Sequence, residues 1–115
     1  MPANRAMLCC CALLLLCACQ SSDFAGPLTQ QLKCVNQVMG SDAQAPVVVI
    51  LTDREFHQRF GSQYDGWYDG GNDTVYLSSH RDNTLLPHEL AHHVQHQEGR
   101  YLNEAQSREV ARLCS

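Results

Sequence analysis

The N-terminal segment of this 115-residue chain limits how large the folded domain can be. Arg5 stands in a short polar start and is followed by an unbroken apolar run from Met7 to Ala18. The run is too short to span a bilayer as a mature helix and is typical of a secretory signal peptide, here residues 1–18. About 100 residues remain for one small domain with a thin core, so a disulfide or a metal ion would contribute usefully to its stability.

The signal peptide ends in the letters LCAC, which resemble the lipobox of bacterial lipoproteins. This implies cleavage before Cys19 and a lipid on that cysteine, whose acyl chains would anchor the domain without a membrane-spanning segment. Gln20 then favours the outer membrane, with the domain facing the periplasm. Ala18 would also serve an ordinary signal peptidase, so an unlipidated periplasmic protein is the alternative. Polar and small residues at 19–26 predict a tether, and the folded domain is expected at 27–115.

Seven cysteines suggest a disulfide scaffold, but few of them can reach the folded domain. Four leave with the signal peptide and Cys19 carries the lipid, so Cys34 and Cys114 remain. In the oxidising periplasm we expect these two to pair, closing a long loop worth about 4 kcal/mol in the chain-entropy model. Two buried thiols are the alternative. A metal role is disfavoured because isolated cysteines form no C-x-x-C chelate.

The charge of the chain excludes one class of partner. Loss of Arg5 leaves 7 basic against 12 acidic residues, a formal charge of about −5. No stretch concentrates Lys and Arg into a basic stripe, so nucleic acid is not an expected partner.

Hydrophobic periodicity predicts an α+β domain with a small mixed or antiparallel sheet and about four helices. The run VVVIL at 47–51 is β-branched and short, which indicates a buried strand, taken here as the central one. Residues 64–77 place aromatic and β-branched residues on both sides of DGGND, which predicts a hairpin. Helices are expected at 28–39, after a Thr52–Glu55 capping box, at 84–97, and from Asn103 onward with Gln106 as a second capping pair.

The helix expected at 84–97 carries the residues that indicate chemistry. His88, Glu89 and His92 match the pattern H-E-x-x-H, and residues four apart project from one helix face about 6 Å apart along its axis. Both imidazoles can therefore bind one Zn²⁺, which in catalytic sites takes three protein ligands and leaves a position for water. Glu89 can reach that water as a general base. The alternative is two surface histidines that flank a helical glutamate without a function.

The third zinc ligand must come from outside this pattern. The chain climbs roughly 7 Å between His92 and the end of its helix, and an antiparallel helix from Asn103 must descend as far, which brings Glu109 to the level of the ion. Glu104 is the competitor, although an acid at the first helical position is expected simply to complement the helix dipole. Further alternatives are Glu98, Asp82 or water.

The other four histidines are not expected to bind the ion. His96 shares the face of His88 but lies about 12 Å farther along the axis, too far to share an ion, and is expected near the edge of the site. His93 points about 100° away and is expected to be packed or solvated. His57 has no predicted partner, and His80 is a candidate for lining the cleft.

The order of elements and the residues at 88–109 resemble the gluzincin class of zinc metallopeptidases in its minimal, single-domain form, the minigluzincins. The resemblance implies a zincin-like fold with one Zn²⁺ per chain. It identifies His88, His92 and, less directly, Glu109 as ligands and Glu89 as the base. The extended metzincin pattern does not fit, because a glutamine and a glutamate stand where it has glycine and histidine.

Two further features follow from this resemblance. An edge strand beside the cleft should bind the substrate backbone by strand addition, and Thr74–Ser78 fall where it is expected. Larger gluzincins also carry a C-terminal subdomain that supplies a Tyr or His to the oxyanion. This chain stops at Ser115, so Tyr101, Tyr76, His80 or a partner protein would have to act instead.

The sequence thus predicts a secreted, zinc-dependent hydrolase of peptide bonds whose partner is a peptide or protein substrate. One alternative is a non-catalytic binding or structural lipoprotein that keeps zinc only to hold two helices together; Glu89 argues against it, since a purely structural site needs no base. A second alternative is a hydrolase of cell-wall peptide amides. The oligomeric state is left open.

Overall fold

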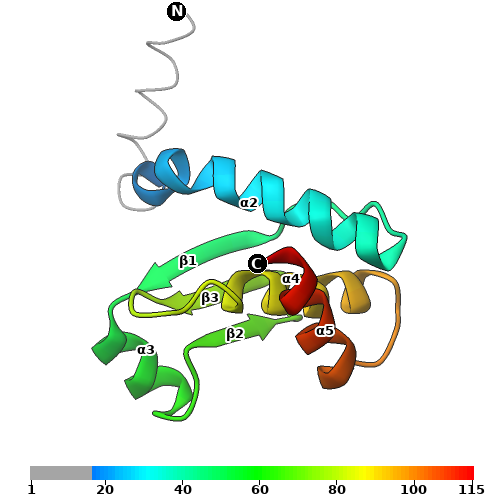
Figure 1. The fold of residues 1–115 in the computed structure, drawn as a ribbon. Coiled ribbons are helices and arrows are strands. Elements are labelled where there is room, and N and C mark those ends of the chain that lie inside the picture. The colour runs from blue at the N-terminus through cyan, green and yellow to red at the C-terminus, as the bar shows by residue number, and fades with distance from the viewer. Residues whose placement is uncertain (1–16) are drawn as a thin grey trace, which may run out of the picture.

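The computed structural model describes residues 17–115, so the predicted signal peptide lies almost wholly outside the described residues. The described part contains four helices and a three-stranded mixed sheet, which confirms the predicted α+β class (Figure 1). No helix among residues 17–115 is long and apolar enough to cross a membrane. In chain order the elements are α2 (Cys17–Met39), β1 (Val47–Leu51), α3 (Asp53–Phe60), β2 (Gly66–Asp69), β3 (Thr74–Ser78), α4 (Leu85–Gln97) and α5 (Glu104–Cys114).

The long helix α2 begins before the position that the sequence suggested. Residues 19–26, expected to be a tether, are helical, and α2 continues through Pro27. A proline removes one backbone donor but does not forbid a helix when the rest of the element is held by packing, and α2 packs against both α4 and α5. The helix ends as predicted, at Met39, where Gly40 adopts a positive φ of 67°.

The sheet has the order β1-β3-β2, with β1 parallel and β2 antiparallel to β3. The predicted β2–β3 hairpin is confirmed, but the prediction that 47–51 is the central strand is wrong, because β3 pairs on both sides. The apolar run of β1 reflects coverage of its faces: Val48 and Ile50 pack against the core, while Val47 at its start is exposed. Apolar composition reports on buried faces and not on which hydrogen-bonding edge is occupied.

Alternate residues of β3 face two different layers. Val75 and Leu77 join the main core with residues of α2 and α4, among them Val35 and Leu90. Tyr76 points to the opposite face, where its ring lies 5.2 Å from that of Phe60 in α3. Helix α3 therefore covers one face of the sheet, and α2 and α4 cover the other (Figure 1).

One local and one long-range prediction hold, and a second local prediction holds in part. The Thr52–Glu55 capping box at the start of α3 is present in both directions. Asn103 caps α5 by accepting a hydrogen bond from the backbone N–H of Gln106, but its own N–H donates to Gln95 and not to the Gln106 side chain. Cys34 and Cys114 form the expected disulfide, which ties the last turn of α5 to the C-terminal half of α2.

Candidate metal centre

Two imidazoles of α4 face one carboxylate at the start of α5. The Nε2 atoms of His88 and His92 lie 3.1 Å and 2.7 Å from the two carboxylate oxygens of Glu104. One ligand atom from each of these three residues lies within 4.8 Å of the others. Ligands at about 2.0–2.2 Å from a tetrahedral Zn²⁺ are roughly 3.4 Å apart, so the spacing suits a single ion. This group could hold a metal ion.

The expectation that Glu109 completes the site is corrected by the structure. The Glu109 carboxylate is on the exposed side of α5, where it pairs with Arg112. The prediction assigned the whole descent towards the ion to the last helix. The six-residue connection 98–103 instead returns the chain to the level of His92 before α5 begins, which an extended segment of that length easily spans. The first residue of α5, Glu104, therefore arrives opposite the two histidines.

The surroundings of His88 and Glu104 favour the forms of these two side chains that bind a metal ion. Burial lowers the pKa of His88, and the neighbouring His92 acts in the same direction, so the neutral imidazole is favoured. Partial burial raises the pKa of Glu104, but His92 and His88, through their hydrogen bonds and through their charge when protonated, outweigh it, and the net pKa is lowered. Neutral imidazoles and an ionised carboxylate are the forms that bind divalent transition metals, so this donor set fits Zn²⁺.

Glu89 lies beside these ligands and against the edge strand β2. Its side chain is only 6 % exposed and lies against Gly66, where a methyl group in place of the glycine hydrogen would come within 3.1 Å of Oε2. Glycine at this position therefore leaves the room that the carboxyl group occupies. Burial, followed by the nearby Glu104 carboxylate, raises the pKa of Glu89 to about 8. A carboxyl group with such a pKa beside a metal-binding group is typical of a proton-transfer residue.

These residues share a cavity of about 620 Å³ that lies between α4, β2 and the start of α5. His88, Glu89, His92 and Glu104 all line it, together with apolar and aromatic side chains. The other lining residues are Gln63, Tyr64, Asp65, Gly66, Trp67, Tyr68, Asp82, Leu85 and Leu102. A polar cluster in a mostly apolar hollow is the usual form of a small-molecule or peptide site.

The other histidines of α4 belong to a separate group at the hairpin turn. His93 Nδ1 and His96 Nδ1 both lie 3.3 Å from the Tyr68 hydroxyl, which donates to Asp73 Oδ1 at 2.7 Å. His96 was expected at the edge of the metal site, but its ring packs over Gly70. His93 and His96, three residues apart on α4, therefore contact the hairpin and not the group formed by His88, His92 and Glu104.

The remaining candidates lie outside the cavity or are engaged elsewhere. His57 has a partner that the sequence did not reveal, since its Nε2 is 2.9 Å from Asp65 Oδ1. His80, proposed for the cleft, pairs with Asp53. Glu98 pairs with Arg100, so it does not supply the third ligand. Asp82 does line the cavity, but its Oδ1 accepts hydrogen bonds from the backbone and hydroxyl of Thr84.

The expected oxyanion donors are also elsewhere. Tyr101 is 95 % exposed, and Tyr76 lies on the α3 face of the sheet, where the Arg59 guanidinium lies over its ring. Neither of them lines the cavity, and neither does His80. Two other tyrosines do, Tyr64 and Tyr68, of which Tyr68 has its hydroxyl engaged by Asp73. Tyr64 was missed as a site residue because the sequence placed it in the hairpin, whereas in the structure it precedes β2 in a loop whose course sequence alone does not reveal.

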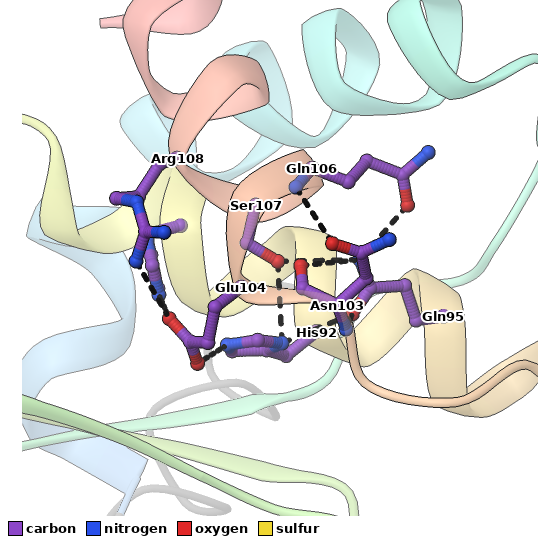
Figure 2. Close-up of polar contacts among 8 residues, drawn as sticks. His92, Gln95, Asn103, Glu104, Gln106, Ser107 and Arg108 are labelled. Carbon is purple, nitrogen blue, oxygen red and sulfur yellow. Dashed lines mark hydrogen bonds and ion pairs between the residues drawn. The ribbon is translucent and has the colours of Figure 1, made fainter.

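Sequence reasoning also missed the residues that hold the ring of His92. Its Nδ1 lies 3.0 Å from Gln95 Oε1 and 3.2 Å from Ser107 Oγ, and both partners are fully buried (Figure 2). A metal-binding histidine commonly donates its second ring N–H to such an acceptor. The available signal was a glutamine inside the apolar part of α4, a position at which an amide needs buried partners.

Comparisons with known proteins add no assignment to this geometry. No family model, curated protein or solved structure matches the chain.

Proposed function

We propose that this chain is a zinc-dependent hydrolase of peptide bonds with a zincin-like fold, similar to the minimal gluzincins. His88, His92 and Glu104 would hold one Zn²⁺, and Glu89 would be the general base. The observation that carries the proposal is the placement of Glu89: it enters the same cavity as the three ligands, is nearly buried, and is not one of them. A site that only stabilised the fold would have no use for this carboxyl group.

The roles of the side chains follow from their positions. Zn²⁺ bound at this site would lower the pKa of a coordinated water, polarise the scissile carbonyl and favour the ionised form of Glu89. Glu89 would accept a proton from the attacking water and return it to the leaving amine, as expected of a carboxyl group held in a largely apolar wall. Gly66 keeps space for that carboxyl group at the floor of the cavity.

The substrate strand is best placed along β2. The expectation of Thr74–Ser78 as the edge strand is corrected by the sheet order, since β3 is central and its donors and acceptors pair on both sides. Among the described strands β2 pairs with β3 alone, and its residues Gly66, Trp67 and Tyr68 line the cavity. An extended peptide could add to β2 and present its backbone to Glu89 and the metal ligands.

Tyr64 is the best candidate to stabilise the oxyanion. It lines the cavity with His88 and Glu89, and its ring packs edge-on against Trp67 at 5.3 Å, which limits its movement. A tyrosine hydroxyl can donate one hydrogen bond to a developing oxyanion.

The test measures zinc content and peptide hydrolysis together on the exported protein with its disulfide intact. We expect one Zn²⁺ per chain in the wild type. Glu89→Gln should retain the ion and lose at least about 100-fold in hydrolysis, the lower end of what a general base contributes. Glu104→Ala should lose tight zinc binding. Glu109→Ala is the matched control on the same helix and should bind zinc like the wild type.

Other outcomes separate the alternatives. Zinc bound by the wild type without hydrolysis of any peptide, whether Glu89 is present or replaced, would favour a structural zinc protein. Cleavage of peptidoglycan fragments but not of unfolded protein would favour a hydrolase of cell-wall amides. A wild-type protein without zinc at neutral pH would contradict the metal site itself. Export and the lipid at Cys19 remain part of the proposal, and mass spectrometry of the membrane fraction tests them.

A further inference from the structure

Gln95 is a fully buried amide of α4 whose polar atoms are all engaged at the junction with α5 (Figure 2). Its Oε1 accepts from His92 Nδ1 and from the backbone N–H of Asn103, both at 3.0 Å. Its Nε2 donates to the Asn103 carbonyl at 3.2 Å and to Gln106 Oε1 at 2.9 Å, with Ser107 Oγ at 3.3 Å. One side chain thus contacts a metal-site histidine and the residue that precedes Glu104.

The orientation of this amide follows from its backbone partners. The Asn103 N–H can only donate and the Asn103 carbonyl can only accept, so Oε1 must face the first and Nε2 the second. An amide oxygen cannot donate, and the hydrogen bond to His92 therefore places a proton on Nδ1. Nε2 is then the ring nitrogen of His92 left to bind an ion, and it is the one that faces Glu104.

The start of α5 departs from a capping box in a way that involves Gln95. In a capping box the side chain at the third helical position accepts from the N-cap backbone N–H. Asn103 makes the first half, accepting from the Gln106 backbone at 3.0 Å. The second half is made by Gln95 Oε1 from the neighbouring helix, while the Gln106 side chain accepts from Gln95 instead. Helix α4 therefore holds the first turn of α5 directly.

We infer that Gln95 is the positioning residue that aligns the two elements of the metal centre. It sets which nitrogen of His92 is free, and through the backbone of Asn103 it places Glu104 opposite that nitrogen. This rests on the proposed metal site and goes beyond it, because it assigns the alignment of ligands from two helices to one side chain that is not itself a ligand. Loss of a ligand's hydrogen-bond partner commonly weakens metal binding by 10–100-fold.

The first test is zinc affinity measured by chelator competition on the full exported protein, with folding checked by circular dichroism. Gln95→Met keeps a similar volume but no polar atom, and we expect it to weaken zinc binding by about 10–100-fold. Gln95→Glu retains acceptors for His92 and for the Asn103 N–H, but its second oxygen faces the Asn103 carbonyl and Gln106 Oε1, so it should recover only part of that loss. Gln106→Ala is the matched control, because it removes a partner of Gln95 without touching His92 or Asn103, and should bind zinc within about threefold of the wild type.

The second test asks whether Gln95 acts on Glu104 as well as on His92. If it does, the loss of affinity on Glu104→Ala should be smaller in the Gln95→Met background than in the wild type, since neighbouring sites are not additive. A purely structural role for Gln95 predicts equal losses in both backgrounds. The visible spectrum of the Co²⁺-substituted protein gives a second readout and should differ between the wild type and Gln95→Met.

A third measurement needs no variant, so it decides the matter even if Gln95→Met does not fold. In the zinc-loaded wild type, ¹H–¹⁵N correlation of the imidazoles should show His92 protonated at Nδ1. Protonation at Nε2 would overturn the inference, and so would equal zinc affinity in folded Gln95→Met and the wild type. A wild type that binds no zinc would instead contradict the proposed function, so the two failures are distinguishable.

Discussion

The two sides of α4 each bring a pair of histidines towards an acidic residue, but they arrange them differently. On the side facing α5, His88 and His92 direct Nε2 atoms at the two oxygens of Glu104. On the side facing the hairpin, His93 and His96 lie 3.8 Å and 3.7 Å from Asp73 Oδ1. Among the described residues only the first group brings three ligand atoms within 4.8 Å of one another.

The two groups differ in the further hydrogen-bond partners of their histidines and of their acidic residue. On the hairpin side, Asp73 Oδ1 also accepts from Tyr68 and Gln97, and His93 Nε2 lies 2.7 Å from the Gln44 carbonyl oxygen. These groups satisfy one another and stabilise the hairpin. On the site side, the partners of His92 bind the far edge of its ring, so that Nε2 is left to face the cavity. The two groups are thus alike in composition, with two histidines and an acid in each, and differ in where the imidazole nitrogens are directed.

The largest expected effect comes from removing one histidine from each side of α4, which tests whether only one side binds zinc. We expect His92→Ala to abolish stoichiometric zinc binding and hydrolysis, because it deletes a ligand. His96→Ala removes an imidazole from the same helix, outside the proposed centre, and should leave zinc affinity unchanged. Zinc titration of both variants decides the matter. Equal losses in the two would mean that the sides of α4 are not functionally distinct.

A second large effect concerns the disulfide, which ties α5 and not the hairpin. Replacing Cys34 and Cys114 together by alanine should lower the free energy of unfolding by about 4–5 kcal/mol in the chain-entropy model, given a separation of 80 residues. Zinc at 100 times its Kd should restore about 2.7 kcal/mol, because the proposed ligands join α4 to α5. Urea unfolding with and without zinc measures both terms. Absence of any zinc-dependent stabilisation would argue against a site shared by the two helices.

The role of Tyr64 can be separated from that of an exposed tyrosine. Tyr64→Phe should reduce kcat by about 100-fold if the hydroxyl stabilises the oxyanion, with zinc affinity unchanged. Tyr101→Phe is the matched control, since Tyr101 is almost fully exposed and lies outside the cavity. Steady-state kinetics on a peptide substrate measures both. If Tyr64→Phe changes only KM, Tyr64 binds the substrate and does not act on the oxyanion.

The smallest expected effect is a pH dependence of the folding stability that comes from Asp73 on the hairpin side of α4. The hydrogen bond from Tyr68 lowers the pKa of Asp73 below 3.8, against a smaller opposing effect of burial. A depressed folded-state pKa contributes stability that is present above the unfolded value and is lost as the pH falls through the folded value. Acid unfolding of the wild type should therefore show a decline in stability below about pH 4 that is smaller in Asp73→Asn, where other carboxyl groups with lowered pKa values, such as Glu104, still contribute. Thermal unfolding from pH 5 to 2 measures it, and identical profiles would contradict the assigned interaction.

Features that depend on neighbours along the chain were predicted well. The Thr52–Glu55 capping box, the Asn103 cap and the hairpin turn each rest on a few adjacent residues with defined backbone preferences. The disulfide was also predicted, by elimination, since the expected signal peptide and the expected lipid at Cys19 accounted for the other five cysteines. Strand order was not, because the apolar run 47–51 is compatible with a central or an edge position when helices cover its faces.

The sequence by itself determined that His88 and His92 project from one face of a helix with Glu89 beside them, because the helical repeat is a local property of the backbone. Which carboxylate meets them was decided only by the tertiary structure. The choice between Glu104 and Glu109 depends on the path of residues 98–103, and that path is held by a buried amide on α4 that bonds to the backbone of Asn103. No repeat or spacing encodes such a contact, since it forms only when the two helices pack.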